Sequence, residues 1–350
     1  MKIATIAGIP IRIHFTFLLV FVWISLTADG HRGLSTAALI GGIFFCVLLH
    51  ELGHALTAKA FGIRTRDITL YPIGGLATLL DRPKPKQEFW IALAGPLVNV
   101  AIALILWPIV LATDGRLPSF QAHLGTGSVQ SELLIANLIL PVFNMIPAFP
   151  MDGGRVLRAI LGMMMPEAKA TQIAGKVGQV LAGAGVVLGI ATANLMLVLI
   201  AVFVFLGASQ EMEASIGHSL MEGRKVSDAM LTDFAVVSHS DTIDDAAKLL
   251  ISGSQQDFPV RFGDEVLGIL TRNDIVRGMS TGAAASYVAG FMRRDVGRLR
   301  PSDDLENAVP IFGATSNCPI LVMSESDLVG LLTVENLGEY MVIQRAKTAN

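Results

Sequence analysis

The sequence has few cysteines and few charges, and each scarcity excludes a class of protein. Cys46 and Cys318 are the only two cysteines among 350 residues, and they lie in different halves, so no disulfide framework is expected. A net charge of −3 gives no basic surface, so no nucleic-acid partner is expected. The first apolar run is not followed by a small-residue cleavage site, so we expect no cleavable signal peptide.

Charged residues are scarcest in the first 210 residues, which consist mainly of long apolar stretches, whereas the remainder alternates charged and apolar residues. This pattern predicts an α-helical polytopic membrane domain at residues 1–215, with short β-strands or a re-entrant hairpin, followed by a soluble α/β module. Six stretches are expected to span the bilayer: 15–26, 36–58, 89–112, 133–149, 173–191 and 195–208.

Basic residues in the connecting loops predict the orientation. Lysines and arginines gather in the loops on the side of the two chain ends, whereas the opposite side holds only Arg32 and Arg116. Because cytoplasmic loops carry an excess of Lys and Arg, both termini are expected in the cytoplasm. The chain is therefore predicted to be a multi-pass protein of the cell membrane.

An H-E-x-x-H pattern, formed by His50, Glu51 and His54, lies inside an apolar stretch in which residues 36–49 carry no charge. Histidines four residues apart project from one helix face, so both imidazoles can reach one Zn²⁺. The intervening glutamate can then act as the general base on water at the metal. Burying three ionisable groups is costly without such compensation, which disfavours a purely structural pair of core histidines.

A catalytic zinc needs a third protein ligand and one open position. Asp152 is the best candidate, because it follows the fourth apolar stretch, which would cross the bilayer in the same direction as the stretch that holds His50. Neighbouring prolines loosen the helix and neighbouring glycines permit close backbone approach. The alternative is that Asp152 is only a helix cap. Three other acidic residues near span ends are expected to be ordinary interfacial charges: Glu88, Glu132 and Glu167.

Residues 63–83, between the second and third apolar stretches, are rich in β-forming residues and include Gly74 and Gly75. Backbone exposed to lipid must be hydrogen-bonded internally. The segment is therefore expected to be either a hairpin or re-entrant loop packed beside the site, or an ordinary cytosolic hairpin. In the first case its edge could pair with a substrate strand.

Several separated motifs resemble those of one family. The motif at residues 50–54, with the later Asn144 and the P-M-D-G-G sequence at 150–154, resembles the site-2 protease family of intramembrane zinc metalloproteases. The G-P-L-V-N sequence at 95–99 resembles another motif of that family. The sequence at 8–14 is similar to the prokaryotic branch that includes the sporulation protease.

This resemblance covers residues 1–215 and implies a role for each motif residue. It implies Glu51 as the catalytic base and a substrate- or oxyanion-contacting role for Asn144. That asparagine stands earlier here than in the Asn-Pro-x-Asp-Gly form of part of the family. The resemblance also implies one zinc ion per chain with three ligands: His50, His54 and Asp152.

From Val226 onward the chain repeats itself. Residues 267–275 recur as residues 329–337, at an offset of 62 residues. Each unit is predicted to contain a helix, two strands and a helix. The units resemble a tandem pair of CBS domains, with repeat 1 at 222–282 and repeat 2 at 284–346.

CBS domains are common sensors of adenine nucleotides. The resemblance implies that Thr271 and Thr333 place a hydroxyl near phosphate and that Asp274 places a carboxylate on the ribose. Asn336 replaces the acid in the second unit, so that half-site is expected to bind weakly or not at all. The pair is expected either to bind ATP, ADP or AMP, or to serve as a structural or dimerising module in a homodimer.

Together these features predict an intramembrane zinc metalloprotease that performs regulated intramembrane proteolysis, with adenine nucleotide as a candidate regulator at the CBS pair. It would hydrolyse a peptide bond in or near the transmembrane segment of a membrane-anchored protein, such as an anti-sigma factor or a membrane-bound transcription-factor precursor. The lipid bilayer is the other expected partner. A CBS-regulated membrane transporter or a catalytically inactive membrane scaffold would explain the spans, but neither needs the complete set of zinc-site residues.

Overall fold

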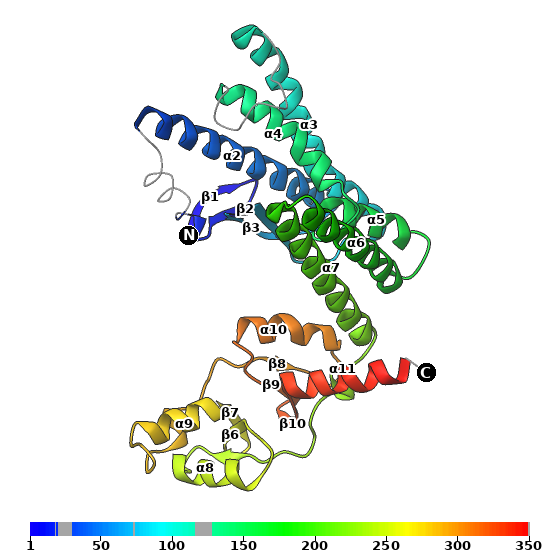
Figure 1. Cartoon of the computed structure of the whole chain (residues 1–350). Helices are drawn as coiled ribbons and strands as arrows, with labels where there is room; N and C mark the ends of the chain where they lie inside the picture. Colours follow the sequence, from blue (N-terminus) through cyan, green and yellow to red (C-terminus); the bar gives the residue numbers. More distant parts are fainter. Residues whose placement is uncertain (18, 20–29, 73, 116–127, 349–350) are drawn as a thin grey trace. The chain divides into compact units, whose positions relative to one another are not determined.

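The computed structural model describes residues 1–350 apart from 18, 20–29, 73, 116–127 and 349–350 (Figure 1). The chain divides into two compact units, Met1–Ser215 and Ile216–Asn350. The first unit holds these elements: β1 (Lys2–Ile6), β2 (Ile9–Ile13), α2 (Gly30–Ala60), β3 (Thr65–Tyr71), β4 (Gly74–Leu79), α3 (Pro85–Asp114), α4 (Val129–Asn144), α5 (Asp152–Gly162), α6 (Glu167–Ala191) and α7 (Leu195–Met221), whose last turns enter the second unit.

A four-stranded sheet packs against α2. Its order is β1-β2-β3-β4, with β2 and β3 parallel and the other neighbours antiparallel, so β4 is an edge strand. Ile9 and Ile68 of the sheet are buried against Leu52 and Ala55 of α2. The sheet is thereby fixed on the helix that carries the H-E-x-x-H pattern.

Four of the described helices are long and apolar enough to cross a membrane: Ser35–Ala60 within α2, and α3, α6 and α7. Helix α4 is apolar but has only 16 residues. Most of the first expected span, residues 15–26, lies outside the described residues. The count of six spans therefore stays a prediction.

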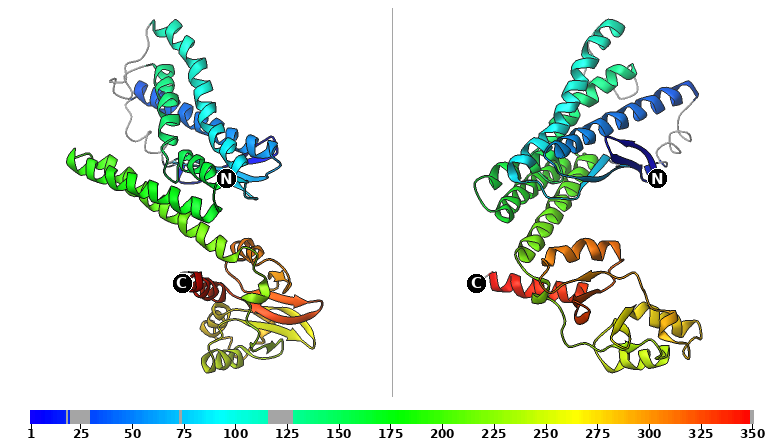
Figure 2. Two further views of the ribbon diagram at one scale, coloured as in Figure 1. Left: turned by 90° about the vertical axis from the view of Figure 1, so that its right-hand side faces the viewer. Right: turned by 180° about the vertical axis from the view of Figure 1, so that it is seen from behind.

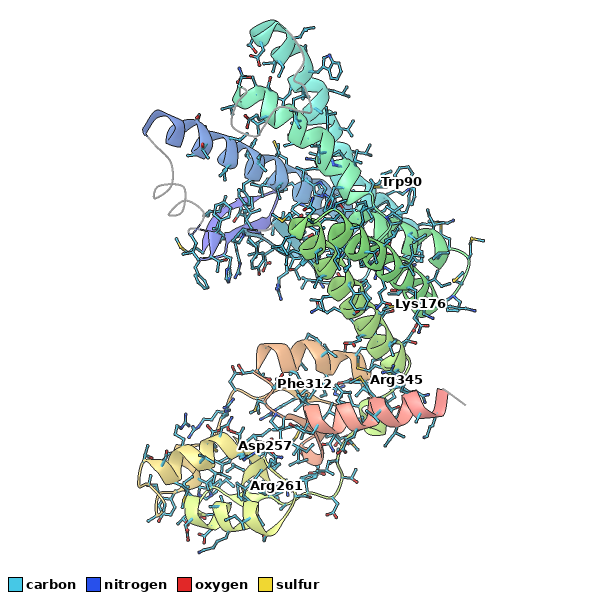
Figure 3. The ribbon with its side chains drawn as sticks, viewed as in Figure 1. Trp90, Lys176, Asp257, Arg261, Phe312 and Arg345 are labelled. Atoms are coloured by element: carbon cyan, nitrogen blue, oxygen red, sulfur yellow. The ribbon has the colours of Figure 1, made fainter. Side chains whose placement is uncertain are left out.

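Small residues let the apolar helices approach one another. A Cβ added at Gly53 of α2 would lie 2.8 Å from Val98 Cγ2 and 3.1 Å from the Ala94 carbonyl oxygen of α3, so this glycine permits the close approach of the two helices. Helices α6 and α7 form a side-by-side pair (Figure 2), and Gly178 of α6 faces Ala208 of α7. Trp90 lies on the outer surface of α3 and is 55% exposed (Figure 3), a position open to lipid.

A partly buried ion-pair network joins three helices, α3, α5 and α7. Arg158 of α5 pairs with Glu88 of α3 and Glu211 of α7. The expectation that Glu88 and Glu132 are ordinary interfacial charges is wrong, because each is only 6% exposed. Glu88 can be buried because Arg158 compensates its charge. Glu167, in contrast, has a side chain 44% exposed and pairs with a surface arginine, as an interfacial charge should.

The second unit contains two three-stranded sheets, β5-β6-β7 and β8-β9-β10. In each, the first two strands are parallel and the last two antiparallel, and the pattern repeats at the 62-residue offset of the sequence. Its regular elements are β5 (Val237–Ser238), α8 (Ile243–Ser252), β6 (Phe258–Phe262), β7 (Glu265–Leu270), α9 (Arg272–Ser280), β8 (Arg298–Leu299), α10 (Ala308–Ala314), β9 (Ile320–Ser324), β10 (Asp327–Leu332) and α11 (Val334–Thr348), with 3-10 turns at Val226–Asp228, Val288–Gly290 and Leu305–Asn307.

The two sheets share an apolar core. Ile269 of β7, Leu321 of β9 and Leu331 of β10 are fully buried in it, together with Cys318. Burial raises the pKa of the Cys318 thiol to about 11. Cys318 therefore acts as a small apolar core residue and not as a reactive thiol.

Candidate metal centre

His50 and His54 lie on one face of α2, one helical turn apart. They are 6% and 4% exposed, and their Nε2 atoms are 3.0 Å apart. Helical periodicity alone accounts for this pairing, because side chains at i and i+4 project from the same face. The sequence prediction that both imidazoles can reach one ion agrees with this geometry.

Asp152 reaches the same point from α5. Its Oδ2 lies 3.1 Å from His50 Nε2, and its Oδ1 lies 3.3 Å from His54 Nε2. It is the first residue of α5, the N-cap is Met151, and the carboxylate faces the histidines. A Cβ at Gly154 would lie 2.7 Å from the Ala148 carbonyl carbon, so glycine allows the preceding loop to fold back on the helix.

These three side chains together could hold a metal ion, since their ligand atoms all lie within 4.8 Å of one another. His54 Nδ1 is 2.6 Å from the Ile91 carbonyl oxygen, which can only accept, so Nδ1 carries the hydrogen. In the neutral ring, Nε2 then presents a lone pair. The lone pair of His54 and the carboxylate oxygens of Asp152 thus face one another, and a cation between them would relieve their mutual repulsion. Two imidazoles and one carboxylate form a donor set that suits Zn²⁺.

Gly95 of α3 provides the space next to the two imidazoles. A Cβ at this position would collide with His54 Nε2 and would lie 2.7 Å from His50 Nε2. In the sequence, Gly95 is recognisable only as part of a motif. Its role depends on the approach of α3 to α2, and the one-dimensional sequence does not show that approach.

Glu51 lies beside the metal ligands and faces β4. Its Oε2 accepts a hydrogen bond of 3.2 Å from the Ala77 backbone N–H. Gly75 leaves room for the carboxylate, because a Cβ there would lie 3.1 Å from Glu51 Oε1. Strands β3 and β4 therefore pair antiparallel and pack beside the site, which agrees with the first of the two alternatives raised by the sequence.

A cavity of about 600 Å³ contains the site. Besides the three candidate ligands and Glu51, it is lined by Asn144, which lies at the last position of α4. Several further lining residues are not recognisable as site residues from the sequence: Tyr71, Leu76, Phe143, Arg155, Phe203 and Gln210. They come from five different elements or loops, so no local spacing could have identified them.

In the second unit, Thr271 and Asp274 form a capping box at the N-terminus of α9. The Asp274 carboxylate accepts from the Thr271 hydroxyl at 2.5 Å, and it pairs with Arg277 at 3.0 Å and Arg293 at 3.1 Å. Neither arginine was predicted from the sequence to lie at this position. The T-x-x-D pattern therefore has a structural use here beside any role in binding.

Thr333 and Asn336 form the equivalent contact in the second repeat. The Thr333 hydroxyl donates to Asn336 Oδ1 at 2.8 Å, and the Asn336 backbone N–H donates to the Thr333 oxygen at 3.1 Å. Asn336 thus replaces the aspartate in the local hydrogen bonding but brings no negative charge. A site for ribose in this repeat would lack the carboxylate.

Comparison with known proteins gives consistent matches in both units. Residues 38–132 and 120–185 match peptidase family M50, and residues 226–281 match the CBS domain. The chain is 33% identical to a zinc metalloprotease of Methanocaldococcus jannaschii over 270 aligned residues. The aligned region covers 77% of this chain and 77% of that protein.

Two further relatives are more distant or shorter. Rip3 of Mycobacterium tuberculosis is 26% identical over 375 residues, covering 99% of this chain and 93% of that protein. Stage IV sporulation protein FB of Bacillus subtilis is 30% identical over 156 residues, covering 44% of this chain and 50% of that protein. The first of these two similarities spans both units of the chain.

Proposed function

The chain belongs to peptidase family M50, the site-2 protease family, and from that premise we propose that it performs regulated intramembrane proteolysis. It is a zinc metalloprotease with membrane-type helices and a CBS domain. The proposed reaction is hydrolysis of a peptide bond in or near the transmembrane segment of a membrane-anchored protein. The observation that carries the proposal is the convergence of the metal ligands and Glu51 on one cavity among helices apolar enough to cross a bilayer.

In the proposed mechanism each side chain has a distinct task. His50, His54 and Asp152 would hold the zinc, which when bound would polarise the substrate carbonyl and make water more acidic. Glu51 takes a proton from the attacking water and delivers it to the leaving amine as the C–N bond breaks. Asn144, in the same cavity, donates a hydrogen bond to the carbonyl oxygen as negative charge develops.

The substrate is proposed to enter as an extended strand beside β4. Strand β4 is at the edge of its sheet and lines the cavity, and its Ala77 N–H points to Glu51. A transmembrane helix bonds its own backbone groups, so its scissile bond must be unwound first. Pairing with an edge strand would replace those lost hydrogen bonds.

The proposed topology is that of a multi-pass protein with six spans and both termini in the cytoplasm. The support for it is the Lys and Arg bias of the loops. Candidate substrates of that geometry include an anti-sigma factor or a membrane-bound transcription-factor precursor.

The second unit is proposed to be a tandem CBS pair, with repeats at 222–282 and 284–346, that regulates cleavage through adenine nucleotide. Thr271, Asp274 and Thr333 are the proposed contacts. Because Asp274 already pairs with two arginines, a ribose would have to replace part of that network. The second candidate role is a dimerising module for a homodimer.

The test of the protease proposal uses Glu51→Gln, which removes proton acceptance but keeps the side-chain shape. Purified wild-type and variant protein should each bind about one zinc, and only the wild type should cleave a membrane-anchored substrate. His54→Ala should lose both properties. Cleavage by Glu51→Gln at the wild-type rate would refute the proposed mechanism, and a wild type without zinc would refute the site.

The substrate can be sought with the same variant. Glu51→Gln carrying a photo-crosslinker at Leu76, which lines the cavity, should trap membrane-anchored proteins. The matched control carries the crosslinker at Leu104, an exposed residue of α3 with 68% of its surface accessible. Capture at Leu104 and not at Leu76 would contradict the proposed path of the substrate.

A further inference from the structure

Two buried asparagines adjoin the metal site: Asn99 lines the cavity, and Asn137 lies behind it. His50 Nδ1 lies 2.6 Å from Asn99 Oδ1, and Asn99 is fully buried in α3, one turn after Gly95. Its Nδ2 donates to Asn137 Oδ1 at 2.8 Å, and Asn137 is fully buried in α4. Both asparagines lie in strongly apolar helices, where a polar side chain without a partner is costly.

The donors and acceptors in the hydrogen bonds that join His50, Asn99 and Asn137 are determined by the surroundings of Asn137. Asn137 Nδ2 lies 2.8 Å from the Leu133 carbonyl oxygen and 3.2 Å from Cys46 Sγ. A carbonyl oxygen only accepts, so the NH₂ group of Asn137 must face it. The Asn137 Oδ1 atom therefore faces Asn99, and Asn99 must turn its own NH₂ group toward it.

This orientation has a consequence at His50. With its NH₂ group engaged by Asn137, Asn99 presents only its oxygen to the ring, so His50 Nδ1 must carry a hydrogen. The neutral ring then has its lone pair on Nε2, the atom that faces Asp152 and His54. If the amide of Asn99 were reversed, Nε2 would carry the hydrogen and could not bind a metal.

We propose that Asn99 and Asn137 are positioning residues of the metal site, which hold His50 in the tautomer and ring orientation that binds zinc. The inference rests on the proposed role of His50 as a ligand. His54 needs no such relay, because its Nδ1 meets the Ile91 carbonyl oxygen directly. Partners of this kind raise metal affinity by orienting the ligand, and their loss typically costs about 10- to 100-fold.

The competing explanation is that the two asparagines only fasten α3 to α4 by an interhelical hydrogen bond. Two substitutions of Asn99 separate the explanations. Asn99→Leu removes the acceptor for His50 and the donor for Asn137. Asn99→Asp keeps an acceptor for His50 but still removes the donor for Asn137. Fastening of the helices is lost in both variants, whereas positioning of His50 is lost only in the first.

The experiment measures equilibrium zinc affinity of the purified full chain by competition with a chromophoric chelator, together with the absorption spectrum of the Co²⁺ form. Asn99→Leu should bind zinc about 10- to 100-fold more weakly and should alter the Co²⁺ spectrum. Asn137→Leu should weaken binding by a smaller factor, and Asn99→Asp should stay near the wild type. Thr171→Val is the matched control, because Thr171 is fully buried in α6 and bonds only its own helix in the described contacts.

The outcomes are distinct. Wild-type zinc affinity in Asn99→Leu, or equal losses in Asn99→Leu and Asn99→Asp, would refute the positioning role while leaving the proposed function intact. If His54→Ala bound zinc as tightly as the wild type, the proposed function and this inference would be refuted together.

Discussion

The contact between Gly95 and the two imidazoles provides a quantitative test of the metal site. In Gly95→Ala the new Cβ would lie 2.7 Å from His50 Nε2, whereas ordinary van der Waals contact begins near 3.4 Å, a shortfall of 0.7 Å. The clash with His54 Nε2 is closer still. Zinc–ligand distances tolerate only about 0.2 Å, so the rings cannot move this far and still bind the ion correctly.

We therefore expect Gly95→Ala to bind zinc more weakly and to cleave substrate at least about 100-fold more slowly. The assay pairs chelator competition with cleavage of a membrane-anchored substrate in detergent. The matched control is Gly41→Ala in α2, where a Cβ would meet nothing within 4 Å. That variant should keep both properties and could gain up to about 1 kcal/mol from helix propensity. Wild-type zinc affinity and cleavage in Gly95→Ala would refute the described packing of α3 against the ligands.

Three further predictions concern other parts of the chain. Arg158→Met leaves the buried Glu88 without its cation, so the free energy of unfolding should fall by about 3–5 kcal/mol. Thermal unfolding in detergent should therefore begin at a lower temperature, and an unchanged unfolding temperature would contradict the ion-pair network. Burial raises the pKa of the Cys318 thiol to about 11, so at pH 8 this residue should be alkylated far more slowly in the folded chain than after denaturation. Peptide mass spectrometry measures the two rates, and fast labelling of the folded protein would contradict the burial of Cys318. Asp274→Ala should weaken binding of AMP or ATP in calorimetry more than Asn336→Ala does, whereas no binding to the wild type at millimolar nucleotide would favour the dimerising role.

Local sequence patterns were sufficient for much of the site. The spacing of His50 and His54 places them on one helix face wherever that helix lies, because the relation depends only on helical periodicity. The apolar stretches predicted most of the long helices. The 62-residue repeat predicted two similar units, but each sheet has three strands where two were expected, because the short strands β5 and β8 have only two residues each. Asp152 was selected from its position after an apolar stretch, and its carboxylate lies beside both histidines.

Sequence reasoning failed where a residue's role depends on which distant segment it meets. Glu88 looked like a surface charge because its neighbours in sequence are polar, but its partner Arg158 is 70 residues away. The sequence of residues 63–83 was compatible with a segment packed beside the site and with an ordinary cytosolic hairpin. Only the packing against α2 placed β4 beside Glu51.

The sequence by itself determined the pairing of His50 with His54 and the position of Glu51 beside them, because the chemistry and helical spacing of these residues are local properties. Tertiary structure alone decided what surrounds them. Asn99 meets His50 across 49 residues, and Asn137 meets Asn99 across 38. In an apolar helix each asparagine requires a hydrogen-bond partner, but its identity depends on the docking of α2, α3 and α4.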